Sequence, residues 1–280
     1  MDETKIESAI KILHFAEIEA RKHNEPVELA YSGGKDSDVL LQLAKESGID
    51  FVAIYKNTTI DPKGTIQHCR EMGATIIQPK LSFFKLIERR GFPSFTRRFC
   101  CENLKEYKIM NVACVGVRQE ESQRRAARYK TFEQCRVYTN GSKVRQFYPI
   151  YNWTLQDLKD YIESRKLRLA APYYDESGNI DYSRRLGCMG CPLPASRSVD
   201  DFKSNPALTR AWLKAGQVWF SKRAPKAEYF YKDAVDLFIM LVFYRSAADY
   251  KKDFFNADGS RKRNHKSWLW RQLGYKLNLN

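Results

Sequence analysis

A pair of glycines between a short apolar segment and a helical pattern constrains the fold of this chain more than any other feature. Residues 27–31 are mostly apolar and predict a buried strand, and residues 36–47 carry apolar side chains at helical spacing. Gly33 and Gly34 lie between them, and glycine allows backbone angles and close approaches that a Cβ would prevent. The order strand, glycine turn, helix predicts an anion site, because free N–H groups and the positive end of the helix meet at the turn.

The polar residues of the same turn predict that the anion is a pyrophosphate group. Ser32, Lys35 and Ser37 add side-chain donors, and Asp36 is placed to meet a magnesium ion directly or through water. The turn is not a Walker A loop, since Leu29 stands where that pattern has its first glycine. A glycine turn without a ligand is the alternative interpretation.

Strand and helix patterns continue to alternate beyond this turn. Strand-like apolar runs occur at residues 51–55, 74–77 and 112–117, and helical patterns occur at residues 62–72 and 100–110. This alternation predicts an α/β fold, with a parallel sheet and helices on both of its faces.

The last part of the chain has a different composition. Beyond residue 200 the strand signals disappear and the sequence is helical, aromatic and basic, which predicts two domains, residues 1–197 and 198–280. The whole chain has 48 Lys and Arg against 33 Asp and Glu, a net charge of +15. Such an excess favours a polyanionic partner such as nucleic acid or a nucleotide.

Neither a membrane segment nor a secretion signal is predicted. The longest apolar run, residues 237–244, is far shorter than the roughly 20 residues that a spanning helix needs. The N-terminus carries acidic residues where a signal peptide carries basic ones. A cytoplasmic protein without membrane contact is therefore expected.

Several segments together resemble the PP-loop family of ATP pyrophosphatases and phosphoadenosine-phosphosulfate reductases. Residues 32–37 read SGGKDS, similar to the family's SGGxDS, and residues 116–125 are similar to its Gly-x-Arg…Glu-Ser-x-x-Arg segment. Residues 148–154 are similar to its later Pro-hydrophobic-x-x-Trp-Thr element. The resemblance implies a Rossmann-like adenine nucleotide α-hydrolase fold that binds ATP or an adenylated nucleotide and cuts between its α- and β-phosphates.

The chemistry of the residues agrees with that implied role. Cleavage between these phosphates requires neutralisation of the leaving pyrophosphate, which backbone N–H groups, Lys35 and Mg²⁺ can provide. Arg118 and Arg125 can each hold phosphate oxygens with two donors. We therefore expect Lys35, Asp36, Arg118 and Arg125 to be catalytic, with ATP held by residues 32–37. A solvated surface is the alternative interpretation of the arginine segment.

Four of the seven cysteines form two pairs, Cys100-Cys101 and Cys188-x-x-Cys191. Four thiolates suit zinc or a [4Fe–4S] cluster, and adjacent cysteines suit separate irons of a cluster better than a single tetrahedral zinc. Ordinary core thiols together with a redox pair are the alternative. The order of the pairs is similar to that in cluster-bearing adenylylsulfate reductases, which implies that these cysteines hold a [4Fe–4S] cluster.

The chain departs from those reductases after Cys191, because no cysteine follows it to attack sulfur. It resembles instead the ATP pyrophosphatases of DNA phosphorothioation systems of the Dnd and Ssp type. That resemblance implies adenylation of a DNA backbone phosphate and insertion of sulfur supplied by a cysteine desulfurase. The alternatives are an adenylylsulfate or phosphoadenylylsulfate reductase that uses an external thiol, and a non-catalytic iron–sulfur module that binds DNA.

Residues 251–272 combine seven Lys and Arg with interleaved aromatic residues, namely Phe254, Phe255, Trp268 and Trp270. Basic side chains neutralise phosphates, and exposed aromatic rings stack on bases. The segment predicts binding to single-stranded or locally opened nucleic acid, DNA in preference to RNA. The alternative is a solvated helix whose aromatic side chains pack inward.

Overall fold

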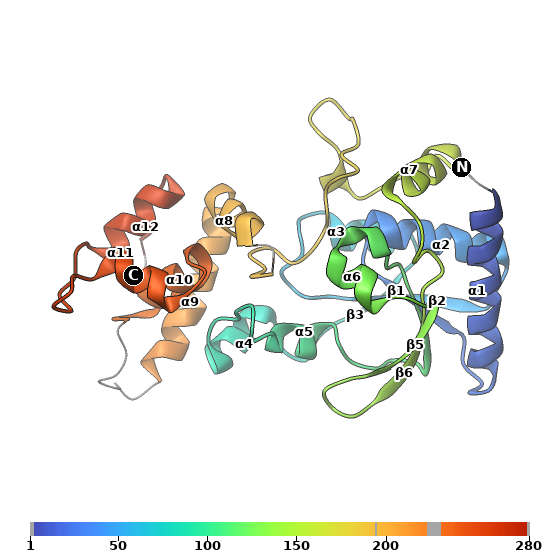
Figure 1. Ribbon diagram of the computed structural model, residues 1–280, viewed down its shortest axis with the longest axis horizontal. Helices are drawn as coiled ribbons and strands as arrows, with labels where there is room; N and C mark the ends of the chain where they lie inside the picture. Colours follow the sequence, from blue (N-terminus) through green and yellow to red (C-terminus); the bar gives the residue numbers. More distant parts are fainter. Residues whose placement is uncertain (1–2, 194, 223–230, 279–280) are drawn as a thin grey trace. The chain divides into compact units, whose positions relative to one another are not determined.

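The computed structural model describes residues 3–193, 195–222 and 231–278, and the chain divides into two compact units (Figure 1). Unit 1 comprises residues 1–79 and 102–187, and unit 2 comprises residues 80–101 and 188–280. This division differs from the single boundary expected between residues 197 and 198. Residues 80–101 pack with the C-terminal helices instead of with the sheet, so the chain enters unit 2 twice.

Unit 1 contains a six-stranded sheet with the strand order β3-β2-β1-β4-β6-β5. The strands are β1 (Val27–Tyr31), β2 (Phe51–Lys56), β3 (Thr75–Ile77), β4 (Val112–Val115), β5 (Glu133–Val137) and β6 (Lys143–Phe147). All neighbouring pairs are parallel except β5 and β6. The predicted α/β class is therefore confirmed, with one antiparallel strand at the edge.

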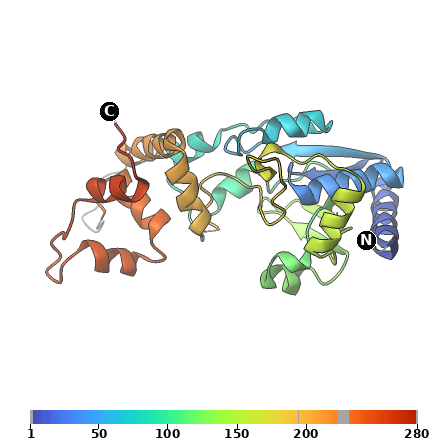
Figure 2. The ribbon, with the colours of Figure 1, turned by 90° about the horizontal axis from the view of Figure 1, so that it is seen from above.

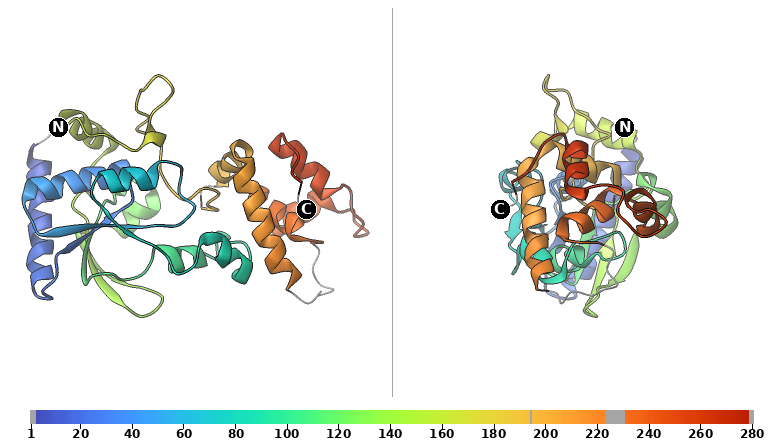
Figure 3. Two further views of the ribbon diagram at one scale, coloured as in Figure 1. Left: turned by 180° about the vertical axis from the view of Figure 1, so that it is seen from behind. Right: turned by 90° about the vertical axis from the view of Figure 1, so that its left-hand side faces the viewer.

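The helical elements of unit 1 are α1 (Glu3–Arg21), α2 (Lys35–Ser47), α3 (Thr65–Glu71), α6 (Gln123–Arg128), α7 (Leu155–Ser164) and the short turns η1 (Gln119–Glu121) and η2 (Ala171–Tyr173). Helices α1 and α2 lie beside the central strands (Figure 3). Because side chains alternate along a strand, Val27, Leu29 and Tyr31 of β1 join the apolar core with these helices, whereas Glu28 and Ala30 point to the opposite face.

The position of β1 and β4 at the centre of the sheet determines where a ligand can bind. From β1 the chain proceeds to β2 and β3 on one side, and β4 begins the other side. Such a point, where the strand order reverses, leaves a crevice at the carboxyl ends of the two strands. The glycine turn follows β1, and Gly116 follows β4, so both lie at this crevice.

Unit 2 is built from α4 (Phe83–Arg90), the beginning of α5 (Phe99–Leu104), α8 (Ala195–Ser204), α9 (Pro206–Ser221), α10 (Ala234–Phe243), α11 (Ala247–Phe254) and α12 (His265–Leu273) (Figure 2). Its core is aromatic. The Trp212 ring centroid lies 5.0 Å from that of Phe83 and 5.2 Å from that of Phe202. Phe254 and Trp268 are buried, so these two rings pack inward and are not exposed for stacking on bases.

A helix must be both long and apolar to cross a lipid bilayer. Within the part of the chain that the structure describes, every helix is too short or too polar to span one.

Candidate functional site

The backbone of the glycine turn has a conformation at Gly33 that favours glycine. Gly33 has a φ of +69°, and a Cβ there would lie 2.9 Å from the Cys69 sulfur. The two serines of the turn brace it: the Ser37 hydroxyl donates to the Gly34 carbonyl over 2.7 Å, and the Ser32 amide donates to the Ser37 oxygen over 3.2 Å. The turn is therefore a rigid, closely approached loop at the start of α2.

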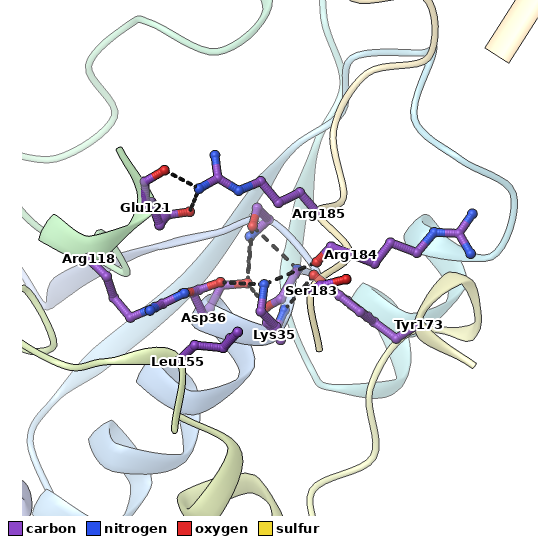
Figure 4. Close-up of polar contacts among 12 residues, drawn as sticks. Lys35, Asp36, Arg118, Glu121, Leu155, Tyr173, Ser183, Arg184 and Arg185 are labelled. Carbon is purple, nitrogen blue, oxygen red and sulfur yellow. Dashed lines mark hydrogen bonds and ion pairs between the residues drawn. The ribbon is translucent and has the colours of Figure 1, made fainter. Parts of the chain in front are cut away.

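Lys35 and Asp36 begin α2, at the positive end of the helix dipole. The Lys35 ammonium donates to the Arg184 carbonyl over 3.1 Å and lies 3.4 Å from the Asp36 carboxylate (Figure 4). Burial lowers the pKa of Lys35. The backbone N–H of Lys35 donates to the Tyr173 hydroxyl over 3.0 Å. Residues far apart in the sequence thus hold this lysine in place.

Arg118 joins the same cluster from the loop after β4. It is buried, and its guanidinium bonds Asp36 over 2.5 Å and Glu120 over 2.9 Å. A Cβ on Gly116 would lie only 2.8 Å from the Asp36 carbonyl oxygen, so glycine lets this loop run against the start of α2. The structure therefore brings Lys35, Asp36 and Arg118, three of the expected site residues, together.

Arg125 lies in the neighbouring group of charges. It pairs with Glu121, and the same carboxylate is 3.5 Å from the Arg185 guanidinium (Figure 4). Burial, and then the charge of Arg185, lower the pKa of Arg125. The basic side chains at this end of unit 1 outnumber the carboxylates that hold them, which favours an anionic ligand.

Sequence reasoning missed Tyr173, Arg184 and Arg185, which the chain brings to the loop from residues that precede the second cysteine pair. The adjacent arginines were a signal, but nothing in their spacing linked them to the loop. It also missed Asp38, which is buried beneath the loop, accepts from the Tyr31 hydroxyl and lies 3.0 Å from His68 Nε2. The available signal was a second aspartate two residues after Asp36, within the same helix.

A cavity of about 240 Å³ lies on the face of the sheet that bears Glu28. Its lining includes Ser32 of the glycine turn, so the cavity reaches this turn. In register across the sheet, Glu28 faces Ala113 of β4, and Ala113 faces Gln146 of β6. Strand spacing separates the Glu28 and Gln146 backbones by about 10 Å, with alanine as the floor between them.

Two buried polar residues, Glu28 and Gln146, lie in the largely apolar and aromatic lining of this cavity. Glu28 is 3% exposed, accepts from the Met110 amide over 3.2 Å and lies 3.3 Å from the Lys56 ammonium. On the other wall, the Tyr148 hydroxyl donates to the side-chain Oε1 of Gln146 over 3.1 Å. Central parallel strands are normally apolar on both faces. An ion pair here is costly to bury, which makes this cavity a candidate ligand site.

The four paired cysteines all belong to unit 2. Cys100 and Cys101 lie in the first turn of α5, and the Arg98 guanidinium donates to the Cys101 sulfur over 3.4 Å. A hydrogen bond with Cys101, burial and the nearby charges of Cys101 and Cys188 raise the pKa of the Cys100 thiol. Cys188 therefore lies near enough to Cys100 to influence it, although the two are far apart in the sequence.

The turn that carries Cys188 and Cys191 is held by packing. Gly190 has a φ of +70°, and a Cβ there would lie 2.6 Å from the Phe202 ring. The Gly190 amide donates to the Asp201 carboxylate over 2.8 Å. In the residues that the structure covers, no three His, Cys, Asp or Glu side chains form a group that could hold a metal ion. The donor chemistry suits thiolate ligation, but the close grouping of ligands is not present.

Comparison with known proteins identifies the family of this chain. Residues 26–194 match the family model of the phosphoadenosine phosphosulfate reductase domain. The chain belongs to this family. Two uncharacterized proteins of Methanocaldococcus jannaschii are 28% and 26% identical to it over 68% and 69% of the chain. The chain covers only 41% and 48% of their lengths.

Two solved structures are similar to part of this chain. A phosphoadenylyl-sulfate reductase from Candida auris is 17% identical, with a TM-score of 0.46 over 65% of this chain and 88% of that protein. An FMN adenylyltransferase from Candida glabrata is 15% identical, with a TM-score of 0.42 over 61% of this chain and 57% of that protein. Both are similar to this chain in fold.

Proposed function

We propose that this chain is an ATP pyrophosphatase that transfers adenylate to an oxygen of nucleic acid, a DNA backbone phosphate in preference to RNA. A persulfide formed by a cysteine desulfurase would then attack the adenylated phosphorus, AMP would leave, and a second thiol would reduce the remaining S–S bond to give a phosphorothioate. The observation that carries the proposal is the grouping of Lys35, Asp36 and Arg118 at the start of α2, directly after the glycine turn. This arrangement suits a pyrophosphate group.

The proposed transfer forms a bond between an acceptor oxygen and the α-phosphorus of ATP and breaks the bond from that phosphorus to the bridging oxygen. Pyrophosphate leaves with the bonding electrons. Lys35 and the loop amides would hold the leaving group, and Arg118 would balance charge that develops on the α-phosphate. Asp36 would hold Mg²⁺ through its carboxylate. When bound, this ion would supply further neutralisation of the phosphate charge.

The cavity beneath the loop supports a nucleotide as the ligand. Its volume of about 240 Å³ suits a nucleoside, and Ser32 connects it to the phosphate loop. A flat base can lie on Ala113, with the Glu28 carboxylate at one edge and the Gln146 amide at the other.

Release of pyrophosphate from ATP tests this proposal directly. The full chain is incubated with ATP and Mg²⁺, with and without DNA, and pyrophosphate and AMP are measured. We expect pyrophosphate, and more of it when DNA is present, whereas AMP should appear in step with it only after a persulfide donor and a thiol are added. DNA binding without ATP turnover would instead support a non-catalytic module.

Membership of the phosphoadenosine phosphosulfate reductase domain family favours one alternative, a sulfonucleotide reductase that takes its thiol from a partner. Sulfite formation from phosphoadenylylsulfate or adenylylsulfate with an added thiol, in the absence of pyrophosphate release from ATP, would establish this alternative and contradict the adenylate transfer.

We also propose that Cys100, Cys101, Cys188 and Cys191 hold a [4Fe–4S] cluster in unit 2. Three observations support this proposal. All four cysteines belong to unit 2, Cys101 and Cys188 both raise the pKa of Cys100, and the turn at Gly190 is closely packed. Iron and zinc per chain are measured after anaerobic purification. We expect iron in the wild type, loss of iron in Cys188→Ser and retention in Cys135→Ser, an exposed control. Zinc without iron in the wild type would contradict the cluster.

A further inference from the structure

Almost all of the net positive charge of this protein belongs to one of its two units. Unit 1 has 25 Lys and Arg against 24 Asp and Glu, a net charge of +1. Unit 2 has 23 Lys and Arg against 9 Asp and Glu, a net charge of +14. A field of this sign attracts polyanions over distances up to about a Debye length. Unit 2 is therefore the part of the chain that a nucleic acid meets with electrostatic attraction.

Three of the basic residues of unit 2 line one surface hollow. It measures about 620 Å³ and lies between the last turn of α11 and the loop that follows it. Its lining contains Lys251, Lys252 and Lys262, together with Asn256 and no carboxylate. All three lysines are exposed. The loop after α11 returns to this helix at Lys262, so Lys262 lines the same hollow as Lys251 and Lys252.

The loop that brings Lys262 back is firmly anchored. Phe255 and Arg261 form an antiparallel bridge, and the Lys262 amide donates to the Phe254 carbonyl over 2.9 Å. The Arg261 guanidinium bonds the fully buried Asp236 carboxylate of α10, so this arginine serves the scaffold. The Lys262 ammonium donates to the Lys252 carbonyl over 2.9 Å. A ligand therefore meets a preformed surface that needs little ordering.

The acidic residues close to the hollow are already engaged. Asp253 pairs with Arg263 over 2.8 Å, and Asp258 accepts from the Ser260 amide over 2.8 Å at the tip of the loop. Phe254 is fully buried against Tyr250, with ring centroids 4.6 Å apart, and Trp268 is 8% exposed. Lysine ammonium groups, together with the half-buried ring of Phe255, are thus what this surface offers to a ligand.

We propose that the hollow lined by Lys251, Lys252 and Lys262 binds the phosphodiester backbone of the nucleic-acid substrate, by charge and without reading the bases. The inference rests on the proposed function for its choice of nucleic acid. Ammonium groups are point charges that neutralise phosphates in any sequence. Binding through them releases counterions, so the affinity falls steeply with salt.

The test compares two variants of the full chain that lose the same charge. The first is Lys251→Gln/Lys252→Gln/Lys262→Gln, and the matched control is Lys203→Gln/Lys214→Gln/Lys222→Gln, which removes three other exposed lysines of unit 2. Binding of labelled duplex DNA is followed by fluorescence anisotropy without ATP, between about 50 and 200 mM salt. Circular dichroism and thermal unfolding verify that both variants are folded.

We expect the first variant to bind more weakly and the plot of log affinity against log salt to become less steep by about 2 to 3, since each neutralised phosphate contributes about 0.9. The control should retain most of the wild-type slope, and changing the DNA sequence should leave the ranking unchanged. Equal losses in the two variants, or a wild-type slope in the first, would overturn the proposal.

This experiment separates the present inference from the proposed function. Binding is measured without ATP, so absence of pyrophosphate release would remove the adenylate transfer and leave the binding result intact. Conversely, ATP turnover with no DNA binding by the wild type at low salt would overturn the lysine hollow as a nucleic-acid site and leave the phosphate loop unaffected.

Discussion

The two units of this chain use charged residues in opposite ways. In unit 1, acids and bases are nearly equal in number, and several are buried against each other at the glycine turn and the cavity, as with Arg118 and Asp36. In unit 2, bases outnumber acids by more than two to one, and the lysines of the hollow are exposed. Buried pairs position groups for chemistry, whereas exposed charge of one sign attracts a partner.

The cores of the two units differ in the same sense. The sheet of unit 1 carries the ion pair of Glu28 and Lys56 on one face, at a free-energy cost that an apolar pair would not have. The core of unit 2 is formed by aromatic rings around Trp212 and Phe238, and its buried Asp236 anchors a loop. We interpret unit 1 as the unit that binds and activates a nucleotide and unit 2 as a scaffold for thiols and positive charge.

The largest expected effect is at the loop of unit 1. In Asp36→Asn the carboxylate that lies between Lys35 and Arg118 loses its charge, so we expect pyrophosphate release to fall by about 10² to 10³-fold, comparable with removal of one group that stabilises a transition state. DNA binding through unit 2 should stay unchanged. Asp50→Asn, an exposed acid of the same unit, is the control. Turnover equal to the wild type in Asp36→Asn would remove Asp36 from the site.

A second prediction concerns the packing of unit 2. Gly190→Ala places a Cβ against the buried Phe202 in a left-handed conformation, so we expect the free energy of unfolding to fall by about 3 kcal/mol. Gly259→Ala has a similar positive φ but no atom within 4 Å of the Cβ, and we expect a loss of about 1 kcal/mol.

Denaturant unfolding of both glycine variants measures the difference between them, and nucleotide affinity should be retained in each because the loop lies in unit 1. If the two variants lose equal stability, the packing of Gly190 against Phe202 does not hold the cysteine turn.

The smallest expected effect is at the contact that joins η2 to the phosphate loop. Tyr173→Phe removes the acceptor of the Lys35 amide, so we expect ATP affinity to fall by about 1 kcal/mol, or about fivefold. Tyr182→Phe, whose hydroxyl bonds the exposed Glu163, is the matched control and should bind ATP as the wild type does. Isothermal titration with a non-hydrolysable ATP analogue measures both. Equal affinities would show that Tyr173 does not support the loop.

The position and shape of the phosphate loop could be predicted from the sequence. A strand, two glycines and a helix are consecutive, and Gly33 adopts a positive φ for a local reason. The α/β class followed from the alternation of strand and helix patterns, which is also local. Arg118 could be found because its segment resembles a family motif. The roles of these residues in catalysis remain predictions.

What the tertiary structure alone decided depends on residues that meet across long stretches of chain. Residues 80–101 joined the C-terminal helices, and Tyr173 reached the loop from η2. Strand register placed Glu28 and Gln146 on either side of Ala113. Burial turned Phe254 inward, and the loop after α11 returned Lys262 to Lys251 and Lys252. Local sequence determines the conformation of a turn or a strand, but which turns and strands become neighbours is determined by the packing of the whole chain, and a linear pattern does not contain that information.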